Sequence, residues 1–269
     1  MSDSGIQSRF RSNSKSRYRE SSVDSLFSER SGEIIVSEET PSHDEIVETS
    51  AASEVPVASR KPPPVPGLWV FPSLLPDHVS RDIITALGDA DIFSGGARDQ
   101  VMLFEAPKHL SANSNLPAYI HELIDRIRVL LLPQLPAEIM ALLFDQSLAR
   151  QVILNLYPPG EGITPHVDLP NRYADGIIGC SLIGGCVMTL QEVNGDHRPD
   201  ECGRYDVYLP PRTVYVLSGE ARWDWTHGIK GREFDIVQGE DGAGERTLLR
   251  DLRVSATFRW MKDGADILS

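Results

Sequence analysis

Three side chains that can bind a metal ion stand in two short segments of the sequence. The first segment, "ITPHVDLP" at 163–170, holds His166 and Asp168 two positions apart. In extended backbone, residues i and i+2 point to the same face, so an imidazole nitrogen and a carboxylate oxygen can reach one point. Taken alone the pair is a weak signal, because a histidine and an aspartate beside a turn also occur without a metal.

The second segment, "RWDWTHGI", supplies His227 further along the chain. The separation from Asp168 lets a pair of strands cross a β-barrel and return to the mouth where the first pair lies. Two histidines and one carboxylate on one face of an octahedral ion leave three positions open, which is the pattern of non-haem Fe(II) oxygenases. The other five histidines lack this arrangement and are predicted to lie on the surface or outside the fold: His43, His78, His109, His121 and His197.

A strand that could bind a dicarboxylate is predicted near the C-terminus, in "RVSATFR". Four polar residues alternate there with apolar ones, so one face of the strand carries two guanidinium groups and two hydroxyl groups. These residues are Arg253, Ser255, Thr257 and Arg259. Inward-facing arginines need anionic partners, and 2-oxoglutarate offers a carboxylate at each end. The alternation fits equally well with a polar face that lies in water.

The elements that must position these residues follow a simple order along the chain. Helices are predicted in "SRDIITAL", with Ser80 as its N-cap, in "PAYIHELIDRIRVLLL" and in "PAEIMALLF". Strands are predicted in "ARQVILNLYP", "DGIIGCSLIGGCVMTLQEV", "GRYDVYLPPRTVYVLSG" and "LRVSATFRWM". Strands without helices between them favour an α+β, mainly β fold: an antiparallel jelly roll, or double-stranded β-helix, with the helices packed on its outside.

Composition divides the chain into three parts. Residues 1–60 are rich in Ser and Glu and are predicted to form a disordered tail. The stretch "KPPPVPG" at 61–67 is predicted to be a linker, and 68–269 the folded domain. The sequence shows no apolar run of about 20 residues and no signal peptide, so no membrane contact and an intracellular location in nucleus or cytoplasm are expected.

The formal net charge of -13 limits the partners. A broad basic surface that tracks phosphates is excluded, so a nucleic-acid substrate would be held by a local patch or a pocket. An acidic surface would also suit a basic protein tail.

The ordered set "NLY", "HVD", "WTHGI" and "RVSATFR" resembles the AlkB family of Fe(II)- and 2-oxoglutarate-dependent dioxygenases, from about residue 68 to the C-terminus. The resemblance implies three catalytic iron ligands: His166, Asp168 and His227. It also implies five contacts to 2-oxoglutarate: Asn155, Tyr157, Arg253, Ser255 and Arg259. Of these, Tyr157 and Arg253 would meet the distal carboxylate, and Asn155 and Arg259 the end that chelates iron. Ser255 stands where the bacterial prototype has asparagine.

The resemblance further implies that Fe(II), 2-oxoglutarate and O2 together oxidise a substrate C–H bond, with loss of formaldehyde from an N-methyl group. Oxidative demethylation or hydroxylation of a nucleobase, in RNA or single-stranded DNA and foremost in RNA, is the first expectation. The text where the family has a nucleotide-recognition lid, 91–110, has only Arg98 and Lys108 as cations. The alternatives are a demethylase or hydroxylase of protein side chains and a non-catalytic binding module, against which the complete ligand set counts.

Aromatic and basic residues around His227 raise a further possibility. If 223–227 is extended, Trp223 and Trp225 share the face of His227 and could stack a base, although core packing is the favoured interpretation. Arg222, Lys230 and Arg232 could meet a phosphate near the same mouth, or could be ordinary surface charges.

Overall fold

The computed structural model describes residues 55–107, 114–193 and 203–265. The helices are α2 (Asp77–Asp89), the short 3-10 turn η2 (Ser94–Gly96), α3 (Ala118–Leu131), α4 (Ala137–Phe144) and α5 (Glu220–Trp223). The strands are β1 (Val57–Ala58), β2 (Leu68–Phe71), β3 (Gln100–Glu105), β4 (Ala149–Tyr157), β5 (Ile163–His166), β6 (Ile177–Ile183), β7 (Cys186–Glu192), β8 (Arg204–Leu209), β9 (Val214–Leu217), β10 (Trp225–Ile229), β11 (Phe234–Gln238), β12 (Glu245–Leu249) and β13 (Arg253–Met261).

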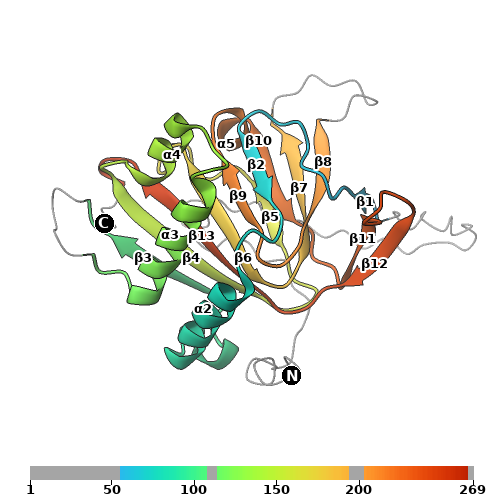
Figure 1. Ribbon diagram of the computed structural model, residues 1–269, viewed down its shortest axis with the longest axis horizontal. Coiled ribbons are helices and arrows are strands. Elements are labelled where there is room, and N and C mark those ends of the chain that lie inside the picture. The colour runs from blue at the N-terminus through green and yellow to red at the C-terminus, as the bar shows by residue number, and fades with distance from the viewer. Residues whose placement is uncertain (1–54, 108–113, 194–202, 266–269) are drawn as a thin grey trace, which may run out of the picture.

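Two antiparallel sheets form the body of the molecule (Figure 1). The larger sheet has six strands in the order β2-β9-β6-β13-β4-β3, and the smaller has four in the order β5-β10-β7-β8. One apolar cluster joins them: Ile177 and Tyr215 from the larger sheet pack with Met188 and Leu209 from the smaller. The sheets therefore face each other across a shared interior, and the predicted jelly roll is confirmed.

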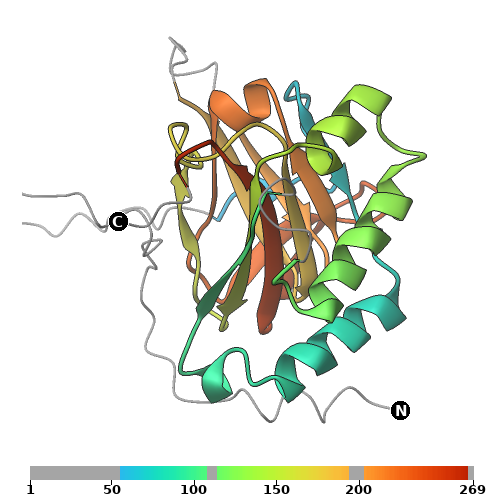
Figure 2. The same cartoon turned by 90° about the vertical axis from the view of Figure 1, so that its left-hand side faces the viewer.

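The helices cover the outer face of the larger sheet, as Figure 2 shows. The core on that side combines residues of α2, α3 and α4 with every second residue of β4 and β13. Val152, Leu154 and Leu156 of β4 point there, together with Val254 and Ala256 of β13. Because side chains alternate along a strand, the intervening residues of both strands must point to the opposite face, between the sheets.

Helix α2 differs from its prediction at its start. It begins at Asp77 directly after Pro76, and Ser80 lies inside it rather than at its N-cap. The Ser80 hydroxyl donates a hydrogen bond of 2.7 Å to the carbonyl oxygen of Leu182 in β6. The N-cap prediction was wrong because this buried hydroxyl ties the helix to the sheet. The helices predicted from "PAYIHELIDRIRVLLL" and "PAEIMALLF" are α3 and α4.

The fold begins before residue 61. Val57 and Ala58 form β1, which pairs in parallel with β11 in a third sheet of order β1-β11-β12. Ala58 is fully buried, and the Arg60 guanidinium donates a 2.7 Å hydrogen bond to the carbonyl of Gln238. Residues 55–60, predicted as the end of the tail, are therefore integrated in the fold because their backbone completes a sheet. Residues 1–54 of the predicted tail lie outside the described residues.

Among the described residues, no helix has the length and apolar character needed to cross a membrane.

Candidate metal and carboxylate site

The side chains of His166 and His227 meet across two paired strands. His166 ends β5 and is the direct antiparallel partner of His227 in β10, and their ring centroids are 4.6 Å apart. Asp168 follows β5 by two residues, and its Oδ2 lies 3.6 Å from His227 Nε2. One potential ligand atom from each of the three residues lies within 4.8 Å of the others. A metal ion bound by all three would need such convergence, and their assignment as ligands stays a prediction.

The two imidazoles are held in forms that can bind a metal. His166 Nδ1 donates a hydrogen bond of 2.8 Å to the carbonyl oxygen of Thr164, which orients the ring and leaves Nε2 as the nitrogen that can bind a metal. Burial, with His166 and Arg222 nearby, holds the pKa of His227 well below its ordinary value of 6.5. His227 is therefore neutral at physiological pH, which is the form that coordinates metals.

Asp168 is buried between positive groups. Its Oδ1 forms an ion pair with Arg259 Nη1, and its carbonyl oxygen accepts a 2.8 Å hydrogen bond from Arg222. An adjacent guanidinium favours the ionised form of a carboxyl group. A buried carboxylate beside two imidazoles suits a divalent cation.

The polar face of β13 points between the sheets. The alternation in "RVSATFR" therefore reflects a pocket-facing strand and not a polar face that lies in water. Arg253, Ser255 and Arg259 are buried, and Thr257 lies between them on the same face. In register, Arg253 faces Tyr157 and Ser255 faces Asn155 across β13 and β4. The strand residues predicted to contact 2-oxoglutarate thus line the same pocket as the two histidines and Asp168.

Arg253 is arranged as an anion receptor. Its Nη1 donates to Ser255 Oγ at 3.2 Å and its Nη2 to Ser181 Oγ at 3.0 Å, while its buried Nε has no hydrogen-bond partner among the described residues. The guanidinium also lies 5.2 Å from the centre of the Tyr157 ring. A buried cation with an unmet donor is costly unless a ligand compensates it, so the residues fit a carboxylate at this end of the pocket.

The sequence reasoning missed three polar residues of this region. Gln151 accepts a 2.9 Å hydrogen bond from Arg259 Nε, Gln100 donates one of 2.9 Å to Asn155, and Ser181 contacts Arg253. Gln151 could have been found, because it shares strand parity with Asn155. Nothing local in the sequence distinguishes Ser181 or Gln100, which are placed by neighbouring strands.

Trp223 and Trp225 do not lie together on one face of an extended strand. Trp223 ends helix α5, so 223–227 is not extended along its whole length and the condition for the two rings to share the face of His227 is not met. Trp225 is buried in the apolar cluster between the sheets and stacks on Tyr205 at a centroid distance of 5.7 Å. Core packing, the favoured interpretation, therefore holds for Trp225.

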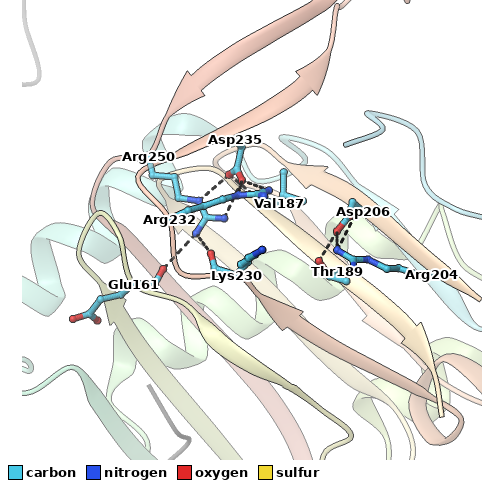
Figure 3. Close-up of polar contacts among 9 residues, drawn as sticks. All are labelled: Glu161, Val187, Thr189, Arg204, Asp206, Lys230, Arg232, Asp235 and Arg250. Atoms are coloured by element: carbon cyan, nitrogen blue, oxygen red, sulfur yellow. Dashed lines mark hydrogen bonds and ion pairs between the residues drawn. The ribbon is translucent and has the colours of Figure 1, made fainter. Parts of the chain in front are cut away.

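The basic residues near His227 are mostly engaged in the fold. Arg222 is buried and bonds to backbone carbonyls, so its prediction as a phosphate contact was wrong. Figure 3 shows Arg232 and Arg250 converging on Asp235, with Arg250 also reaching the Lys230 carbonyl at 2.6 Å. In the predicted lid, Arg98 is exposed, and Lys108 lies outside the described residues.

Comparison with known proteins supports the likeness seen in the motifs. No family model matches the chain. The tRNA (carboxymethyluridine(34)-5-O)-methyltransferase alkbh8 of Xenopus tropicalis is 40% identical over 119 residues, covering 40% of this chain and 18% of that protein. The Alkylated DNA repair protein ALKBH8 homolog of Arabidopsis thaliana is 28% identical over 225 residues, covering 74% of this chain and 59% of that protein.

The chain thus spans less than two thirds of the length of both curated relatives. Among solved structures, OsALKBH1 aligns with a TM-score of 0.43 and 18% identity, covering 72% of this chain and 98% of that chain. The names of the curated relatives confirm the resemblance that the sequence motifs predicted.

Proposed function

We propose that this AlkB-like protein is an Fe(II)- and 2-oxoglutarate-dependent dioxygenase that demethylates or hydroxylates a nucleobase in RNA. The observation that carries the proposal is the convergence of His166, Asp168 and His227 on one point of a pocket that also holds two buried arginines. A pocket with three metal-binding groups and two guanidiniums has the donors for a cation and for a dianion together.

The donor set fits iron and its co-substrate. His166 Nε2, one Asp168 oxygen and His227 would hold the ion, because one potential ligand atom from each lies within 4.8 Å of the others and all three residues line the pocket. Fe(II) with 2-oxoglutarate and O2 supplies the oxidising chemistry when bound, and succinate and CO2 leave as by-products. The residues of the chain bind, orient and shield these reactants.

Arg253 would bind the distal carboxylate of 2-oxoglutarate through its Nε–H, which meets no acceptor in the described part of the chain, with the Tyr157 ring packed beside it. Arg259 would hold the end of 2-oxoglutarate nearer the metal, because it already lies against Asp168. Ile163, Ile229 and Met188 line the same pocket and limit the entry of water. Exclusion of water strengthens the ion pairs and keeps the reactants from side reactions.

RNA as substrate is supported by the frog relative, whose name refers to a tRNA nucleoside. The acidic chain, with a formal net charge of -13, argues against a surface that follows a long duplex. A single base presented in the pocket mouth would need few phosphate contacts, which agrees with one exposed arginine, Arg98, on the described part of the predicted lid.

The test is coupled turnover of the purified protein with Fe(II), 2-oxoglutarate and O2. Succinate should form faster with modified RNA than with methylated single-stranded DNA or histone peptides. Formaldehyde produced in step with succinate identifies demethylation, and succinate without formaldehyde identifies hydroxylation. Stimulation by peptides alone would replace RNA with protein as the substrate class, and iron-loaded protein that forms no succinate would contradict the dioxygenase.

A further inference from the structure

Arg222 is a buried cation that the proposed chemistry does not use. It is 1% exposed and lies in α5, on the short connection that leads into β10 and His227. Burial lowers the pKa of Arg222 to about 10, with the Asp175 carboxylate opposing that shift. An apolar residue would fill the same space without the cost of burying a charge, so the guanidinium calls for a specific reason.

The Arg222 guanidinium donates hydrogen bonds to three backbone carbonyls of one loop. Its Nη1 donates to the carbonyl of Asp168 at 2.8 Å, its Nη2 to that of Tyr173 at 3.1 Å, and its Nε to that of Ala174 at 3.3 Å. These carbonyls belong to the segment between β5 and β6. A planar fork of donors can satisfy three carbonyls at once, whereas a lysine ammonium cannot reach three such points in one plane.

A second contact runs in the opposite direction. Both oxygens of the Asp175 carboxylate accept hydrogen bonds from the backbone N–H of Gly219, at 3.2 and 3.1 Å, and Gly219 directly precedes α5. Asp175 Oδ1 also accepts from the N–H of Gly176 at 2.7 Å. The pair Arg222 and Asp175, here called the clasp, therefore joins the 168–176 loop to the start of α5 at both ends.

The clasp links segments that carry two different metal-binding groups. His227 is fixed by backbone pairing with β5 on one side and β7 on the other. Asp168 lies outside the strands. The backbone hydrogen bonds between this loop and the end of β13 are made by later loop residues: the Ala174 N–H donates to the Trp260 carbonyl, and the Arg172 carbonyl accepts from the Lys262 N–H. Arg222 contacts the Asp168 backbone itself.

We propose that Arg222 and Asp175 are positioning residues that set the distance between Asp168 and His227, and so tune metal affinity. The inference rests on the proposed metal site. Groups that orient metal ligands without touching the ion commonly contribute about 10–100-fold to affinity. The clasp would do so through the backbone of the Asp168 segment.

The experiment titrates Mn(II), a redox-inert probe for the iron site, into the full metal-free chain and follows free Mn(II) by electron paramagnetic resonance. Arg222→Lys keeps the charge but loses the fork, and Asp175→Asn weakens the bonds to Gly219. Each should weaken Mn(II) binding about tenfold or more. The matched control is Arg150→Lys, at another buried arginine, which pairs with Glu105 and stacks on Trp260 away from the site. It should lower thermal stability and leave Mn(II) affinity unchanged.

A merely structural clasp predicts something else. In that case Arg222→Lys and Arg150→Lys would both lower the melting temperature of the metal-free protein while Mn(II) affinity stayed at the parent value, which would overturn the inference. The parent chain must bind Mn(II) in the same titration. A parent protein that binds no Mn(II) would contradict the proposed function. That result differs from a parent that binds Mn(II) and variants that bind it equally well, which would contradict only the role of the clasp.

Hydrogen exchange of the unmodified protein gives a second readout that does not depend on any variant folding. Mn(II) should slow exchange at the Gly219 amide, which donates to Asp175, while the Ile127 amide in α3 stays unchanged. Slowed exchange along β10 with no change at Gly219 would show that the clasp is not coupled to the metal and would also overturn the inference.

Discussion

The two imidazoles of the site are placed by a single cross-strand pair, since His166 and His227 are direct partners in β5 and β10. A ladder of backbone hydrogen bonds therefore sets their separation, and neither side chain has to be held by a loop. Asp168 differs, because it depends on Arg222 and Arg259 for its placement. At the scale of single residues, the histidines should tolerate substitution without loss of the fold.

His166→Ala should abolish metal-dependent succinate formation and leave the melting temperature of the metal-free protein nearly unchanged, because His166 lies at a strand end and is only partly buried. Inductively coupled plasma analysis of bound iron and a thermal melt check both parts. His78→Ala, at an exposed position on α2, is the control and should retain iron. Full iron content in the His166 variant would refute its role as a ligand.

Arg253→Gln should raise the 2-oxoglutarate concentration needed for half-maximal turnover by about 10–100-fold, since a hydrogen bond to a charged group contributes about 1.5–3 kcal/mol. Steady-state succinate assays over a range of 2-oxoglutarate measure the change. Arg246→Gln, at an exposed position on β12, should behave as the parent. If both variants saturate alike, the pocket arginine does not bind the co-substrate.

The metal-free protein should lose stability as the pH falls below about 6.5. Burial holds the pKa of His227 well below 6.5, so in acid the unfolded chain binds a proton that the folded chain does not. The contribution of His227 to the free energy of unfolding is constant at pH values above its pKa in the unfolded chain. Below that pKa the free energy of unfolding falls by at most about 1.4 kcal/mol per pH unit. Urea unfolding at about pH 7 and pH 5.5 should differ by about 1 kcal/mol more in the parent than in His227→Gln. An equal difference would assign the effect to other groups.

At the scale of elements, alternation was the most informative signal in the sequence. The period of two in "RVSATFR" predicted two faces of β13, and the structure assigns the polar face to the pocket and Val254, Ala256 and Phe258 to the helices. The sequence could not choose between pocket and water, because that choice depends on which strands flank β13. The flanking strands, β4 and β6, lie far apart from it along the chain.

The misses share a physical cause. Extended backbone at Trp223 was the condition for its ring to face the site, but α5 ends there, just before β10, and its Arg222 bonds to the 168–176 loop. Ser80 was expected at a helix end and instead bonds to β6. In each case the residue or its neighbour makes a tertiary hydrogen bond, and such partners cannot be identified from neighbouring residues in the sequence.

Strand β1 contributes to the stability of the fold. Removing residues 1–60 should destabilise the fold by about 2–4 kcal/mol, because it deletes the fully buried Ala58 and the strand that pairs with β11. Removing residues 1–54 leaves β1 intact and is the matched control. Chemical unfolding of the two truncated proteins checks the difference. Equal stabilities would show that β1 adds nothing to the fold.

At the scale of the whole molecule, the architecture separates two tasks. The helices and the outer face of the larger sheet form an apolar core, whereas the charged groups of the site are collected between the sheets. The general fold class could be predicted because segments with strand patterns follow segments with helix patterns along the sequence. The sequence predicted that "HVD" and "WTHGI" meet, but the direct pairing of His166 with His227, and of Tyr157 with Arg253, is seen only in the structure.

The buried Arg253, one of whose donors meets no acceptor within residues 55–107, 114–193 and 203–265, has a consequence for how long the protein survives. Folding must confine a charge that the bound co-substrate would neutralise, so 2-oxoglutarate should act as a conformational stabiliser, contributing about 2.7 kcal/mol at a hundredfold excess over its Kd. A thermal melt with 2-oxoglutarate should shift upward far more than one with propionate, which has a single carboxylate, and equal shifts would contradict this account. Protease digestion should follow the same order. The supply of 2-oxoglutarate would then set the lifetime of the protein. A shortage of 2-oxoglutarate would speed degradation of the protein as well as stop its turnover.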